Sequence, residues 1–178
     1  MLYICGMIVT INTDASFRHD HKLGSYAFWI TSDKGRIKKS GVLKGEQLNP
    51  SEAEFKCILN AIYTLGKLGY EDIDKIVINS DALHVINYIK SNKQQTNKRG
   101  NPKSSDFNSW RYLLLMQYNE YINKFGFKGK IDLRHVKAHT QNTDSRSFVN
   151  KWCDKEAGTK LKKYLADTKI SINFESSN

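Results

Sequence analysis

Alternating apolar positions predict three strands at the start of the chain. The first is Met7–Phe17, in which Val9 faces one side and Ile8 the other. Apolar residues on both faces indicate a central strand that is covered on both sides. Two further runs of strand-forming residues, Gly24–Ser32 and Arg36–Leu43, are separated by a glycine-containing turn. Short turns between consecutive strands predict an antiparallel meander.

The rest of the chain is predicted to contain helices, from apolar residues at helical spacing, and strands, from short apolar runs. Four segments have apolar residues at helical spacing: Asn49–Gly69, Ala82–Ser91, Asp106–Phe125 and Ser147–Leu165. In the first, Ser51 and Glu54 have the spacing of a capping box. In the second, we expect Leu83, Ile86 and Ile89 to point inward. Two short runs predict additional strands: Lys75–Asn79 and Lys130–Val136.

The predicted order is β-β-β-α-β-α-α-β-α. Three antiparallel strands followed by strands reached through helices imply an α/β fold with one mixed, five-stranded sheet flanked by about four helices. No repeat or linker suggests a second domain, so residues 1–178 are expected to form a single domain. Its core should cover residues 3–165, and the weakly patterned tail at 167–178 is expected to fray.

Charge points to a polyanion. The 178 residues carry 28 Lys and Arg against 18 Asp and Glu, a net charge of +10, which favours a nucleic-acid partner. Three widely spaced cysteines indicate reduced thiols in the cytoplasm and no disulfide framework. The apolar N-terminus lacks a basic region and is interpreted as a strand, and no apolar run is long enough to span a membrane.

Four carboxylates occupy positions that a mixed sheet can bring together. Asp14 and Asp81 end predicted strands, while Glu54 and Asp154 lie near the starts of helices. Such a cluster requires cations, and oxygen-only ligands suit Mg²⁺ or Mn²⁺. Each acid also has an ordinary structural interpretation: a turn residue, a helix cap or a solvated helix acid. Glu52 is an alternative ligand to Glu54.

Five segments in chain order resemble the motifs of type 1 ribonuclease H. The resemblance covers roughly Ile8 to Ala157. The segments are Thr13-Asp14-Ala15-Ser16, Ser51-Glu52-Ala53-Glu54-Phe55, Asn79-Ser80-Asp81, His135-Val136-Lys137-Ala138-His139 and Asn150-Lys151-Trp152-Cys153-Asp154-Lys155-Glu156-Ala157.

The resemblance implies an endonuclease that cuts the RNA strand of RNA–DNA hybrids, leaving 5′-phosphate and 3′-hydroxyl ends. It implies two Mg²⁺ ions, replaceable by Mn²⁺, held by Asp14, Glu54, Asp81 and Asp154. It also implies that His139 assists water activation or the release of product or metal, unless His139 is an ordinary loop residue. The spacing of His135 and His139 would suit zinc only on a helix, and this segment is predicted to be a strand entering a loop.

The same resemblance suggests which residues contact the hybrid. They are Ser16, Phe17, Asn49, Ser51, Lys90, Lys98, Arg99, Lys103 and Asn150. The basic stretch Lys90–Lys103 lies where the family carries a basic protrusion, and contacts to phosphates there would make binding salt-dependent. No obligate protein partner is evident. Two alternatives remain: a metal-dependent DNA nuclease related to resolvases and integrases, and a non-catalytic nucleic-acid-binding relative.

Overall fold

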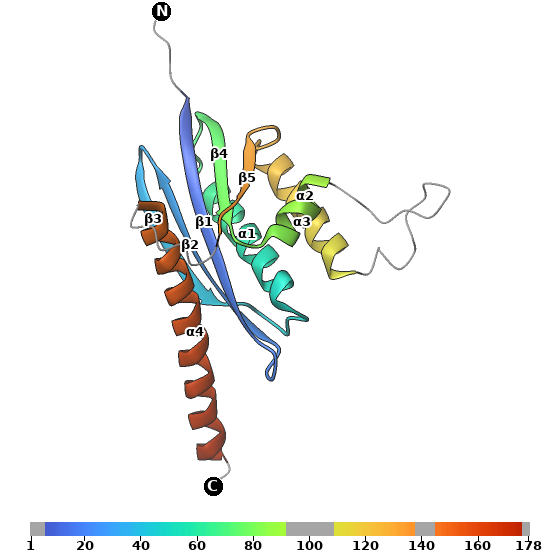
Figure 1. Ribbon diagram of the computed structural model, residues 1–178, viewed down its shortest axis with the longest axis vertical. Helices are drawn as coiled ribbons and strands as arrows, with labels where there is room; N and C mark the ends of the chain where they lie inside the picture. Colours follow the sequence, from blue (N-terminus) through green and yellow to red (C-terminus); the bar gives the residue numbers. More distant parts are fainter. Residues whose placement is uncertain (1–5, 92–108, 138–144, 176–178) are drawn as a thin grey trace, which may run out of the picture.

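A computed structural model describes residues 6–91, 109–137 and 145–175. Within these ranges the chain forms one five-stranded sheet in the order β3-β2-β1-β4-β5 (Figure 1). The strands are β1 (Met7–Arg18), β2 (Leu23–Ser32), β3 (Gly35–Val42), β4 (Ile73–Ser80) and β5 (Ile131–His135). The predicted mixed α/β sheet and its element order are therefore confirmed.

The pairing of the strands determines where the candidate site forms. β1 is antiparallel to β2, and β2 to β3, whereas β1, β4 and β5 are parallel neighbours. Asn12 on β1 pairs with Asn79 on β4, and Ser80 pairs with His135 on β5. The carboxyl ends of the parallel strands thus share one edge, and Asp14 and Asp81 follow the paired asparagines there.

Helices cover both faces of the sheet (Figure 1). They are α1 (Pro50–Lys67), α2 (Leu83–Ser91), α3 (Trp110–Lys124) and α4 (Ser145–Glu175). α1 packs against β1, and Ile58 and Ile62 share the main core with Val9 and Ile11, to which α2 and α3 also contribute. α4 lies on the opposite face, where Cys153 and Ala157 pack with Ala27 and Trp29 of β2.

The first strand is covered on both sides over only part of its length. Val9 is fully buried under α1, but Ile8, on the opposite face, is 56% exposed. The prediction that both faces are covered is wrong at Ile8, because α4 packs further along the strand. Trp29, which pairs with the later residue Asn12, is among the residues that α4 covers.

The start of α1 is capped differently from the prediction. Asn49 is the N-cap, and its side chain accepts a hydrogen bond of 3.0 Å from the Glu52 backbone N–H. Glu52 in turn accepts a bond of 2.7 Å from the N–H of Leu48. The capping box expected at Ser51 and Glu54 is therefore wrong. Pro50 explains the shift, since proline is favoured at the first helical position and makes the preceding residue the N-cap.

Two other helix predictions need correction. Leu83 opens α2 and is 43% exposed, whereas Val85, Ile86 and Ile89 are buried. The last helix continues to Glu175 and does not end at Leu165, because no glycine or proline follows Gly158 to stop it. Fraying of the tail stays a prediction. None of the helices in the described ranges is long and apolar enough to cross a bilayer.

Candidate active site

Three carboxylates from three separate elements converge at the shared edge of the parallel strands. Asp14 lies on β1, Asp81 directly follows β4, and Glu54 lies near the start of α1. One oxygen from each lies within 4.8 Å of the others, and all three residues are partly buried. The structure therefore brings together three of the four acids that the sequence singled out.

One carboxylate oxygen of Glu54 holds the side chain in place, and the other has no hydrogen-bond partner within the described ranges. Its Oε1 accepts a hydrogen bond of 3.1 Å from the backbone N–H of Ala15, which ties the start of α1 to β1 beside Asp14. Its Oε2 is buried and has no hydrogen-bond partner among the described residues. A buried carboxylate oxygen without a donor is costly, and a cation beside it would remove that cost.

The electrostatics of the cluster favour a bound cation. Burial, followed by the charges of Asp81 and Asp154, raises the pKa of Asp14 from 3.8 to about 8. Burial and the charges of Asp14 and Asp81 raise the pKa of Glu54 well above its usual value. A divalent cation would reverse both effects, and carboxylate oxygens are the ligands that Mg²⁺ and Mn²⁺ accept.

Glu52, the alternative ligand, is engaged elsewhere. It is 6% exposed, and its Oε1 lies 2.7 Å from the Lys56 ammonium while its Oε2 accepts the helix-capping bond from Leu48. The Lys56 ammonium also donates to the side-chain oxygen of Gln47, 2.7 Å away. These bonds stabilise the β3–α1 connection, and they support Glu54 as the acid that faces the site.

Asp154 lies beside the cluster without belonging to it. It is an exposed residue of α4 and is not one of the three acids within 4.8 Å of one another. Its charge nevertheless contributes to the raised pKa of Asp14. The neighbouring Cys153 thiol donates to the Asn12 carbonyl at 3.6 Å, which anchors this part of α4 to β1. His139 lies outside the described residues.

Two asparagines that the sequence analysis did not select hold the two acidic strands in register. The Asn79 side-chain amide donates to the Asn12 side-chain oxygen at 3.0 Å, and both residues are buried. Each is two residues before an acid of the cluster, in Asn12-Thr13-Asp14 and Asn79-Ser80-Asp81. That repeated Asn-Thr/Ser-Asp pattern is the signal that would have identified them.

The described residues among the predicted substrate contacts lie on or next to β1, α1, α2 and α4. Ser16 and Phe17 follow Asp14 on β1 and are partly buried, as is Asn150 on α4. Asn49 uses its side chain to cap α1. Lys90 is exposed at the end of α2. The three remaining cations lie outside the described residues: Lys98, Arg99 and Lys103.

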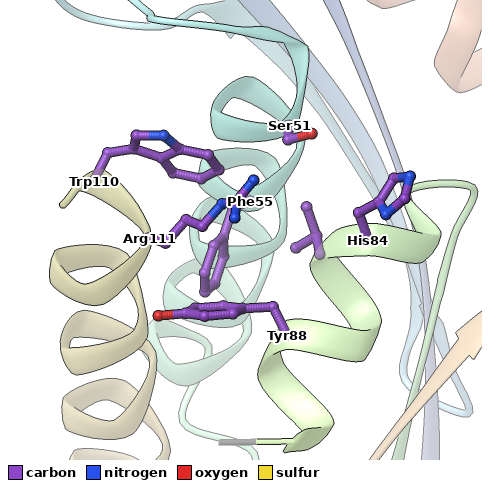
Figure 2. A pocket seen from close by; sticks show the side chains of 7 residues that line it. Ser51, Phe55, His84, Tyr88, Trp110 and Arg111 are labelled. Atoms are coloured by element: carbon purple, nitrogen blue, oxygen red, sulfur yellow. The ribbon is translucent and has the colours of Figure 1, made fainter. Parts of the chain in front are cut away.

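Ser51 borders a small pocket between α1, α2 and α3. Figure 2 shows Trp110 and Arg111 of α3 facing His84 and Tyr88 of α2, with Ser51 at the start of α1. The cavity volume is about 160 Å³. A pocket with aromatic rings and a guanidinium offers a stacking surface for bases and a cation for phosphates.

The protein combines a mixed sheet, a cluster of carboxylates where its parallel strands end, and a net charge of +10. These features are typical of metal-dependent nucleases. The RNase H family profile matches residues 7–162. The chain therefore belongs to the RNase H family, and the enzyme class expected from the sequence, ribonuclease H, is confirmed. No curated protein sequence matches the chain.

Solved structures share the fold at low sequence identity. RNase H1 from the halophilic archaeon Halobacterium salinarum is 15% identical, with a TM-score of 0.61 over 88% of this chain and 98% of that one. The N-terminal RNase H domain of Rv2228c from Mycobacterium tuberculosis is 13% identical, with a TM-score of 0.64 over 91% of this chain and 99% of that one. LC11-RNase H1, isolated from compost and solved with an RNA/DNA hybrid, is 13% identical, with a TM-score of 0.60 over 88% and 99%.

Proposed function

We propose that this protein hydrolyses the RNA strand of RNA–DNA hybrids at a site formed by Asp14, Glu54, Asp81 and Asp154. The observation that carries the proposal is the convergence of Asp14, Glu54 and Asp81 within 4.8 Å in a chain of the RNase H family. The hybrid bound to LC11-RNase H1, a protein of the same fold, supports the choice of substrate.

The residues present suit two Mg²⁺ ions, with Mn²⁺ as a substitute. Asp14, Glu54 and Asp81 would hold them, and Asp154 would add a fourth carboxylate from α4. When bound, such ions would activate water and stabilise the leaving oxygen of a phosphodiester. Cleavage of the bond between phosphorus and the 3′-oxygen would leave 5′-phosphate and 3′-hydroxyl ends. The Ala15 N–H keeps Glu54 aimed at the site. His139 would move a proton or aid release of the product.

Substrate binding would rest on charge and on the pocket between the helices. The net charge of +10 favours contacts with phosphates. Trp110 and Arg111 line the same pocket as Ser51 and offer a stacking surface and a cation (Figure 2). The basic stretch Lys90–Lys103 would supply further cations for contacts with phosphates. We expect affinity for the hybrid to fall steeply with salt and to depend little on sequence.

Cleavage of a labelled RNA–DNA hybrid in Mg²⁺ tests the proposal, run beside double-stranded DNA, double-stranded RNA and single strands. We expect only the RNA strand of the hybrid to be cut, with 5′-phosphate ends, and activity to disappear in EDTA. Cleavage of DNA would identify a nuclease of the resolvase or integrase type. Binding without cleavage in Mg²⁺ or Mn²⁺ would leave a non-catalytic binding protein.

A matched pair of substitutions on α1 tests the site itself. Glu54→Gln removes the charge that faces Asp14 and should abolish cleavage. Glu52→Gln makes the same chemical change two residues away, where the side chain caps the helix and pairs with Lys56. It should lower stability but leave metal-dependent cleavage in the folded protein. The opposite pattern would make Glu52 the ligand.

Two further expectations belong to the same proposal. Residues 1–178 would act as a single domain without an obligate protein partner. The protein would work in the cytoplasm, which is supported by the buried, unpaired thiols of Cys57 and Cys153.

A further inference from the structure

A groove crosses the part of the sheet that α4 leaves uncovered. Its cavity volume is about 610 Å³, and its floor is uncharged, formed by residues such as Ile8, Thr10 and Val77. Phe148 and Val149, near the start of α4, form one wall. The groove extends to Asn12 and Asn79, each two residues before an acid of the active site. It therefore adjoins the candidate active site but lies on different residues.

Cations border this groove on both sides. Arg36 stands on β3, while Lys75 and Arg134 stand on β4 and β5. Asp132 forms ion pairs with Lys75 at 3.2 Å and with Arg134 at 2.8 Å, so one acid is shared between two cations. Arg36 is exposed and makes no ion pair within the described part of the chain. The lining therefore retains positive charge that can meet phosphates.

The wall of the groove carries an exposed aromatic ring. Phe148 is 64% exposed, and its ring meets Trp29 edge-on with 6.1 Å between the ring centroids. Trp29 is itself buried and supports the Phe148 ring. The Lys38 ammonium lies 3.7 Å from the centroid of the Trp29 ring and adds a positive charge nearby. An exposed aromatic ring beside cations on an open sheet face is the arrangement on which unpaired bases stack.

We propose that this groove binds single-stranded nucleic acid, with a base stacked on Phe148 and the backbone along Arg36, Lys75 and Arg134. The uncharged floor between these cations leaves room for bases. Four inter-strand spacings separate Arg36 on β3 from Arg134 on β5, roughly 19 Å, which matches about five to six nucleotides at the rise of a stacked strand. This site does not depend on cleavage and can be assayed without metal.

Fluorescence anisotropy with labelled dT and rU 12-mers in EDTA tests the proposal. Phe148→Ala should weaken binding about 5- to 150-fold, the effect of losing one stacked base. Arg36→Gln should lower the slope of log affinity against log salt by about 0.7, the value for one phosphate contact of a single strand. Arg36 is exposed, so this variant is expected to fold even if Phe148→Ala does not.

Matched controls come from the opposite face of the sheet. Tyr63→Ala and Lys67→Gln remove an aromatic ring and a cation from the exposed side of α1 and should leave both affinity and salt slope unchanged. Equal losses in the groove and control variants, or no binding of either 12-mer by the wild type, would overturn the proposal. So would sedimentation velocity showing a dimer that Phe148→Ala dissociates, because the groove would then be a self-association surface.

Discussion

Replacing Asp14 with asparagine should make the metal-free protein more stable. Asp14 is partly buried beside two other carboxylates, and its pKa is raised from 3.8 to about 8. Between these two values the folded protein holds a proton that the unfolded chain has released. Stability therefore falls as the pH rises through that window, and asparagine removes this loss.

The size of the effect follows from the shift in pKa. The loss of stability begins near the ordinary pKa of 3.8 and continues toward the raised pKa of about 8. At pH 7 the destabilisation by Asp14 is therefore at most about 4 kcal/mol. Glu54 is coupled to Asp14 by charge, and Asp14 is only partly buried, so the gain should be smaller, about 1–2 kcal/mol. For a chain of this size that is an increase in melting temperature of roughly 2–8 °C.

Thermal melts in EDTA between pH 4 and pH 8 test this reasoning. The difference between Asp14→Asn and the wild type should be near zero at pH 4 and grow up to pH 8. Asp33→Asn makes the same change in an exposed turn and should have no effect. Mg²⁺ should raise the melting temperature of the wild type more than that of Asp14→Asn. A variant that is less stable at every pH, or a difference that does not vary with pH, would refute the argument.

Three other substitutions test contacts outside the cluster of Asp14, Glu54 and Asp81. Lys56→Met should cost about 1–3 kcal/mol of unfolding free energy, because it leaves the buried Glu52 carboxylate without its charged hydrogen-bond donor; urea denaturation measures this, and an unchanged midpoint would contradict it. Ser25→Ala removes the buried 2.6 Å hydrogen bond to the Ala157 carbonyl that joins β2 to α4, and should cost about 1–2 kcal/mol in the same assay. Gly69→Ala should cost about 1 kcal/mol, since Gly69 has a φ of 65° after α1; a stabilised variant in thermal melts would show that the turn tolerates a side chain.

The sheet was predictable because its strands carry strong local signals. Runs of Val and Ile around Val9 and Ile76 predicted buried strands, and the intervening helices implied that these strands run parallel. Their carboxyl ends then had to share an edge, which is why the approach of Asp14 to Asp81 could be inferred from the sequence alone.

The details that could not be predicted depend on packing between distant segments. Ile8 is exposed because of where α4 packs, and nothing in the pattern around Ile8 reports that position. The true cap of α1 depends on whether Asn49 or Ser51 begins the helix, and both residue types are good caps. The hydrogen bond between Asn12 and Asn79 requires the register of β1 and β4 to be known.

The pairing of β1 with β4 also determines when the active site can form during folding. Asn12 and Asn79 are 67 residues apart in sequence, whereas β1, β2 and β3 are joined by short turns. Contacts between distant segments form slowly because a long loop must close first, so the meander can assemble while Asp14 and Asp81 are still far apart. A shift of one residue in this pairing would turn one set of side chains to the opposite face of the sheet. Recovery of metal-dependent activity during refolding would therefore report the docking of β4 in its correct register, and not the collapse of the chain.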